Sequence, residues 1–85
     1  MYLGNIVIME WKDFEENVRD VLELEEDVVL TPELELENTD FWSSMHALLI
    51  MALGESEYGI SISGEDLRSS KTLGGLFDLF KSKMA

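Results

Sequence analysis

The first clear pattern in the chain is an amphipathic segment near its N-terminus. Apolar side chains recur there at steps of three and four residues, at Trp11, Phe14, Val18, Val21 and Leu22. This spacing places them on one face of a helix with polar residues opposite, and it predicts a helix over residues 10–24. Acidic residues gather at the C-terminal end of this segment, where the helix dipole disfavours negative charge and helps to end the helix.

The periodicity is lost over residues 25–43, which predicts an unusually long loop for a small domain. Within it, Thr31 followed by Pro32 is typical of a local turn, with a capping threonine before a proline at a first helical position. Leucines at 30, 34 and 36 are expected to anchor the loop to the core. Residues 28–30 could also form a strand, but no convincing second strand is available to pair with them.

A second helix is predicted over residues 44–57, and it is apolar around much more than the usual arc. One stripe along the helix consists of Met45, Leu48, Leu49, Ala52 and Ser56. Four further residues widen it, namely Ala47, Ile50, Met51 and Gly54. The helix is therefore either the most buried of the bundle or one that exposes apolar residues at its first turn to a partner. Both explanations can hold, because different turns can do different jobs. Gly54 costs helix stability, about 1 kcal/mol against alanine, which only close packing would explain.

The last third of the chain carries clear start and stop signals. Gly59 suits a left-handed helix stop, and Ile60 and Ile62 alternate with a serine as in an extended segment with both isoleucines inward. Residues 63–66 form a capping-box pattern that predicts a short helix over residues 64–69. Thr72 can cap a last helix over residues 73–83, whose apolar face is Leu73, Leu76, Phe77 and Phe80. The predicted fold class is all-α: a small four-helix bundle of three main helices and one short helix, with a long loop between the first two.

Composition narrows the class of partner. The 85 residues have a net charge of -12, with no lysine or arginine between Arg19 and Arg68. Nucleic acids and anionic membrane surfaces are bound by clustered cations, so we expect neither nucleic acid binding nor stable membrane insertion. A basic protein partner is favoured, although acidity that only keeps the domain soluble is an equally simple explanation. Cysteine is absent, so any thiol chemistry would need a thiol from elsewhere.

The N-terminus predicts neither a signal peptide nor a membrane span. Residues 1–9 are apolar but short, without a basic segment or a small-residue cleavage site. We therefore expect a cytoplasmic protein with an N-terminal extension over residues 1–9 and one helical domain over residues 10–85. Met9 could be the natural start, and the sequence leaves open whether residues 1–8 belong to the native chain.

Ser44 is the candidate for chemistry, because it opens the apolar second helix. A serine in that position is most often a cap alone. His46, the only histidine, is two residues away, and positions two apart face different sides of a helix, so a Ser44–His46 nucleophilic pair is not expected. No metal-ligand constellation is present. Trp42 is expected to be a core plug under the loop rather than a ligand platform.

Four short segments, in order and spacing, resemble acyl carrier proteins. They are Leu30-Thr31-Pro32-Glu33, Trp42-Ser43-Ser44-Met45, Tyr58-Gly59-Ile60, and Glu65-Asp66-Leu67 followed by Lys71-Thr72-Leu73. None is specific alone; together they resemble the family over most of the chain. The residue before the serine is usually Asp in this family and is Ser43 here, which bears on recognition by the modifying enzyme. The Leu-Gly-Gly that precedes the serine of peptidyl carriers is missing, which argues for an acyl carrier.

The resemblance implies a non-catalytic, monomeric carrier. It implies a 4'-phosphopantetheine arm on Ser44 that holds acyl groups as thioesters for enzymes of a lipid, polyketide or related biosynthetic pathway. The implied partners are a phosphopantetheinyl transferase and acyl-loading and acyl-transferring enzymes with basic docking surfaces. The candidate docking residues are Asp40, Ser43, Met45, Glu55 and Glu57.

A protein of a different functional class is also compatible with the sequence. An unmodified acidic helical adaptor that binds basic partners would keep the same bundle, and Ser43 in place of Asp is the feature that favours it. The sequence leaves the acyl cargo, the pathway and the choice between a free-standing carrier and an excised module undecided.

Overall fold

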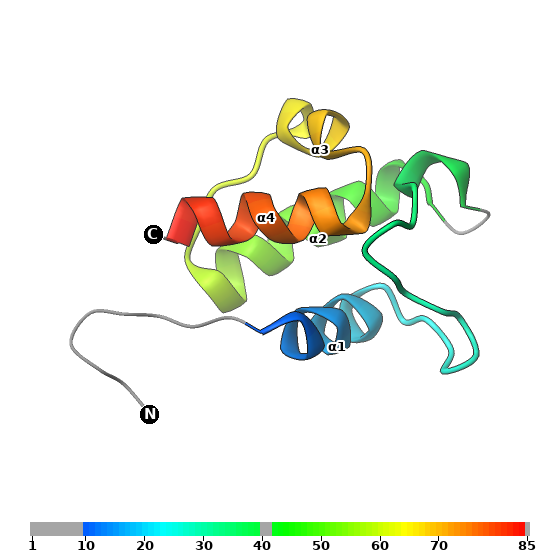
Figure 1. The fold of residues 1–85 in the computed structure, drawn as a ribbon. Coiled ribbons are helices and arrows are strands. Elements are labelled where there is room, and N and C mark those ends of the chain that lie inside the picture. The colour runs from blue at the N-terminus through cyan, green and yellow to red at the C-terminus, as the bar shows by residue number, and fades with distance from the viewer. Residues whose placement is uncertain (1–9, 40–41, 85) are drawn as a thin grey trace.

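The structure is a computed structural model that describes residues 10–39 and 42–84. In chain order these residues form α1 (Trp11–Val21), the 3-10 turn η1 (Leu36–Asn38), α2 (Ser44–Tyr58), α3 (Gly64–Ser70) and α4 (Leu73–Met84), as Figure 1 shows. Over these two ranges the only β-type pairing is one isolated bridge, between Glu35 and Thr72. The predicted all-α bundle with a long first loop is confirmed. The predicted N-terminal extension lies outside the described residues.

The helix α1 is shorter than predicted: it ends at Val21, whereas the prediction placed its end at residue 24. Leu22 is the C-cap, and Glu23 adopts a left-handed conformation with φ 54°. The backbone N–H of Leu24 then donates to the carbonyl of Arg19 at 2.9 Å, which closes the helix end. Leu22 is still buried, so the apolar face continues past the helix although the helix does not.

The long loop is fastened to the start of α4, far along the chain. The backbone N–H groups of Leu73 and Gly74 donate to the carbonyls of Leu34 and Pro32, each at 2.9 Å, and Leu36 N–H donates to Lys71 O at 3.0 Å. A Cβ at Gly74 would lie 2.9 Å from the Pro32 carbonyl oxygen, so glycine permits this approach.

Two expectations for this loop meet different outcomes. Leu30 and Leu36 are buried and Leu34 is half-buried, so the leucine anchors are confirmed. The turn after Thr31 is closed by Leu34 N–H donating to Thr31 O at 3.1 Å, but no helix begins at Pro32. The helical turn comes later, at η1, because α4 uses the carbonyls that a helix from Pro32 would need.

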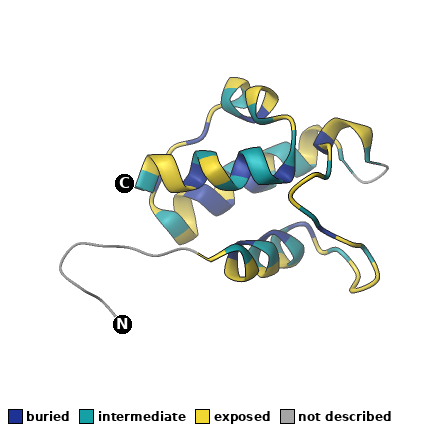
Figure 2. Cartoon of the chain, in the orientation of Figure 1, coloured by how far each residue is buried: buried dark blue, intermediate teal, exposed yellow. Residues whose placement is uncertain are grey.

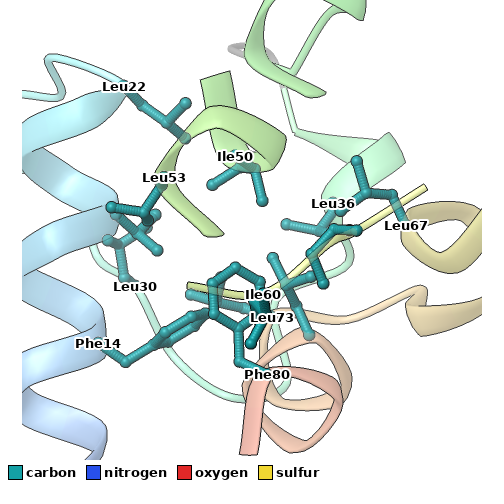
Figure 3. Packing of buried hydrophobic residues seen from close by; sticks show 13 residues of the cluster. Phe14, Leu22, Leu30, Leu36, Ile50, Leu53, Ile60, Leu67, Leu73 and Phe80 are labelled. Atoms are coloured by element: carbon teal, nitrogen blue, oxygen red, sulfur yellow. The ribbon is translucent and has the colours of Figure 1, made fainter. Parts of the chain in front are cut away.

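The core forms where α2 meets the other three helices. Phe14 of α1 lies between two rings of α4, with centroid distances of 5.3 Å to Phe77 and 5.1 Å to Phe80. Figure 3 shows side chains from every helix and from the long loop converging on this cluster. Ile60 and Ile62 are both buried, as the alternation predicted. Burial of such apolar area, about 25 cal/mol per Å², is what holds a chain without disulfides together.

The burial of α2 changes along its length (Figure 2). Its buried residues are Ile50, Leu53 and Gly54, whereas Met45 is 66% and Leu48 is 62% exposed. The predicted stripe from Met45 to Ser56 therefore faces solvent, apart from half-buried Leu49. Two of the buried residues, Ile50 and Gly54, were predicted only to widen that stripe. The first turn exposes apolar side chains, as the second explanation expects. The helix is not the most buried of the bundle, because seven of its fifteen residues are exposed, against four of twelve in α4.

Gly54 is explained by close packing, as the sequence suggested. A Cβ there would lie 3.2 Å from Cγ1 of Ile62 and 3.4 Å from Cγ1 of Ile60. The missing side chain lets the extended segment after α2 approach the helix. The turn into that segment is made by Gly59, which has the predicted left-handed conformation with φ 64°.

The local caps predicted for the last two helices are present. Ser63 Oγ accepts from Asp66 N–H at 3.0 Å, and Asp66 Oδ2 accepts from Ser63 N–H at 3.1 Å, which completes the capping box of α3. Thr72 Oγ1 accepts from Gly75 N–H at 3.0 Å at the start of α4. The helices α3 and α4 each end one residue beyond the predicted end.

Candidate functional site

Ser44 is the first residue of α2, and its side chain is exposed. The preceding Ser43 is the N-cap, with extended backbone, and its Oγ accepts from the backbone N–H of His46 at 3.5 Å. The same Oγ lies 2.7 Å from Nδ1 of the His46 ring. The His46 ring thus contacts the Ser43 hydroxyl. No pair between His46 and Ser44 was expected from the sequence. The Ser44 hydroxyl makes no hydrogen bond to any described residue.

The surroundings of Ser44 favour an anion. The first turn of α2 contains no acidic residue, and the first backbone N–H groups of a helix have no partner within the helix. With the positive end of the helix dipole, these groups suit a phosphate group. The first turn fits a phosphate ester on the Ser44 hydroxyl.

An apolar cleft of about 380 Å³ opens beside Ser44, between α2, η1 and α3. Its walls are mainly apolar, and they consist of Leu36, Trp42, Ala47, Leu48, Met51, Gly64 and Leu67, with Glu37, Ser44, Arg68 and Lys71 as polar members. Trp42 is half-buried and packs against the core. Its indole also forms a wall of the cleft, so it is more than the plug expected from the sequence. The cleft is lined so that it can hold an apolar chain.

The candidate docking residues do not form one cluster. Met45 is adjacent to Ser44, and Glu55 follows about three turns later on the same side of α2, about 17 Å along the axis. Glu57 is also exposed, but it lines a hollow with Asn17 and Asp20 on the side facing α1. Asp40 lies outside the described residues.

Two cationic residues of the cleft were not recognised from the sequence. Arg68 in α3 and Lys71 after it line the same cleft as Ser44. Their signal was present, since they are the first cations after Arg19 in a strongly acidic chain. Only the packing of α3 against α2 brings them to the cleft.

The described ranges contain neither a metal-binding cluster nor a helix that could span a bilayer. No group of three or more His, Asp or Glu side chains gathers there in a way that could hold a metal ion. None of the helices in those ranges combines the length and apolar character needed to cross a bilayer.

The fold and the site define a small helical carrier domain, in which an exposed serine opens the central helix beside an apolar cleft. The chain is similar to the solution NMR structure of holo acyl carrier protein from Geobacter metallireducens, with a TM-score of 0.73 and 26% sequence identity. The match covers 86% of this chain and 83% of that one. This structural match supports the acyl carrier protein family for the chain. No protein-family model and no curated protein matches the sequence.

Proposed function

We propose that this chain carries acyl groups as thioesters on a 4'-phosphopantetheine arm attached to the hydroxyl of Ser44. The observation that carries the proposal is the position of Ser44, exposed at the N-terminus of α2 and at the mouth of the apolar cleft. The likeness to a holo acyl carrier protein supports it. When bound, the arm supplies the thiol that this cysteine-free chain lacks.

The residues of the chain have separate roles in this function. Ser44 Oγ provides the ester oxygen, and the first N–H groups of α2 stabilise the phosphate charge beside it. The cleft takes an apolar acyl chain and shields it from water. The chain itself makes and breaks no acyl bond; it presents the cargo to partner enzymes of a lipid, polyketide or related pathway.

Partner enzymes would dock on the exposed side of α2. Met45 and Leu48 offer an apolar contact next to Ser44, because both are more than half exposed. Glu55, on the same side, would meet a basic surface of the transferase or of an acyl-transferring enzyme. Ser43 would lie at the edge of this contact, with its hydroxyl already used by the cap.

The test is intact mass after incubation with coenzyme A and a broad-specificity phosphopantetheinyl transferase. We expect one phosphopantetheine on the wild type and none on Ser44→Ala. Ser69→Ala, which removes an exposed hydroxyl from α3, is the matched control and should still be modified. A Ser44→Ala variant that still gains the mass would contradict the assigned site, and a folded wild type that gains none leads to the comparison with Ser43→Asp.

An unmodified acidic adaptor is the second candidate, favoured by Ser43 where the family usually has Asp. The variant Ser43→Asp separates the two functions. If Ser43→Asp accepts the arm and the wild type does not, Ser43 has impaired recognition by that transferase. If neither accepts it, the adaptor is the better description.

A further inference from the structure

The apolar cleft beside Ser44 continues into a polar hollow. The hollow has a volume of about 400 Å³ and is lined by Glu35, Glu37, Asn38, Arg68, Lys71 and Thr72. Arg68, Lys71 and Glu37 line both spaces. The two cations therefore lie where the apolar cleft meets the polar hollow.

In the part of the chain that the structure describes, these two cations have no partner, although the chain has three times as many acidic as basic residues. Three other cations are engaged: Arg19 with Glu15 at 3.2 Å, Lys83 with Asp66 at 3.5 Å, and Lys81 over the Phe77 ring at 4.9 Å. Within the described ranges, the side chains of Arg68 and Lys71 make no ion pair or hydrogen bond. Glu35 and Glu37 line the same hollow without pairing with them, and Glu35 accepts a hydrogen bond from Asn38.

The backbone of Lys71 gives a second, independent observation. It has φ 65° and ψ -50°, the conformation of a γ-turn with positive φ, which is rare and strained, and Thr72 N–H donates to Ser70 O at 2.6 Å across it. Its carbonyl accepts from Leu36 N–H at 3.0 Å, so the position is fixed against the long loop. Backbone strain of this kind is found most often at functional sites. Here the strained residue is one whose side chain lines the apolar cleft.

We propose that Arg68 and Lys71 bind an anionic group at the free end of the acyl cargo, so that this carrier is specific for acyl chains that end in a carboxylate. The inference rests on the proposed function. The methylene groups of the chain would contact the apolar walls, among them Trp42, Met51 and Leu67. The guanidinium and ammonium groups would then make charge-assisted hydrogen bonds to the carboxylate. Both side chains reach solvent, so the carboxylate keeps part of its hydration.

The experiment compares two cargoes of equal length on the same carrier. The full chain is loaded from octanoyl and suberyl coenzyme A, so that Ser44 carries either an acyl chain with a methyl end or one with a carboxylate end. Both forms carry the same arm, so any contact of the cations with the arm phosphate cancels in the comparison. The readouts are the rate of thioester hydrolysis and the NMR shift of the Arg68 side-chain N–H.

In the wild type, we expect hydrolysis of the suberyl form to be about two- to fivefold slower than that of the octanoyl form, the range of partly exposed ion pairs. The Arg68 N–H should shift with the suberyl cargo alone. Both differences should be lost in Arg68→Gln/Lys71→Gln. The matched control Lys12→Gln/Lys81→Gln removes the same charge from α1 and α4 and should keep them.

A charge-reversed pair gives a positive test that a damaged fold could not imitate. Arg68→Glu/Lys71→Glu should slow hydrolysis of an aminooctanoyl cargo, which ends in an ammonium group, and no longer that of the suberyl cargo. If the arm loads but the two cargoes behave alike in the wild type, this inference is wrong and the carrier function stands. If neither the wild type nor Ser43→Asp accepts the arm, the proposed function itself fails.

Discussion

Ser43 shows how much one side chain decides at the start of α2. Its Oγ satisfies the backbone N–H of His46 and lies against the His46 ring, and the next residue, Ser44, is exposed. The Asp usual in the family could accept the same N–H with a charged oxygen. The change from Asp to Ser therefore keeps the cap and removes one negative charge next to Ser44.

The cap can be measured by substitution at this one position. We expect Ser43→Ala to lower the free energy of unfolding by about 1 kcal/mol, because an N-cap hydrogen bond is lost. Ser43→Asp should raise it by about 0.5 kcal/mol, because a carboxylate interacts favourably with the helix dipole. Urea denaturation followed by circular dichroism measures both. Ser61→Ala, at an exposed position of the extended segment, is the control and should change little. A neutral Ser43→Ala would show that the cap contributes nothing to stability.

At the scale of elements, short α3 depends on a few local contacts. Its first turn is closed by the reciprocal hydrogen bonds of Ser63 and Asp66, and Lys83 of α4 lies 3.5 Å from the Asp66 carboxylate. The Ser63 backbone N–H, and to a lesser extent its side chain and Lys83, hold the pKa of Asp66 below its ordinary value; partial desolvation opposes them. Since α3 also carries Leu67 and Arg68, these contacts support one wall of the cleft.

This pKa shift predicts a pH dependence of stability. The pKa of Asp66 is lower in the folded chain than in the unfolded chain, so ionisation of Asp66 favours folding. Its contribution is fully present above the ordinary value of 3.8, and it is lost as the pH falls through the lower folded-state value. The stability difference between wild type and Asp66→Asn should therefore shrink in that acid window. Urea midpoints across the acid range measure it.

Glu65→Gln is the matched control for this experiment, because it removes one carboxylate from the same turn of α3 without touching the capping box. A wild-type advantage over Asp66→Asn that stays constant as the pH falls would show that ionisation of Asp66 does not carry the effect.

At the scale of the whole molecule, the charge of -12 produces a field that any partner meets before contact. Salt screens such fields, with a Debye length of about 10 Å at 0.1 M. Yet charge alone does not define a docking face, because acidic residues occur on several sides of the bundle. Under the proposed function, the position of the serine would select one of these sides, namely the exposed side of α2.

We expect the KM of the transferase for this carrier to rise several-fold when salt is raised from about 0.05 to about 0.5 M, with kcat little changed. Glu55→Gln should raise KM at low salt more than Glu57→Gln. The two variants remove the same charge from the same helix, but Glu55 shares the side of Ser44 and Glu57 faces α1. Equal effects would mean that the partner responds to net charge and not to this face of α2.

The sequence by itself determined most of the helices and their ends, because these depend on contacts within a few residues. The capping box at Ser63, the left-handed stop at Gly59 and the cap at Thr72 are local, and the structure has all three. Ser44 was also found from sequence, through the order of four short motifs, although its modification remains a prediction. The end of α1 was not found, because a left-handed Glu23 leaves no clear signal in the residue pattern.

Only the tertiary structure decided which side of α2 is buried, because that helix is apolar nearly all round and periodicity cannot choose a face. The face is set by what packs against it, and Gly54 marks the place where Ile60 and Ile62 approach. The cleft likewise depends on distant contacts: the hydrogen bonds between residues 32–36 and 71–74 place η1, α3 and α2 around one space. In the sequence, Arg68 and Lys71 stand out only as the first cations after Arg19. They become a candidate binding site because this packing brings them beside the cleft of Ser44.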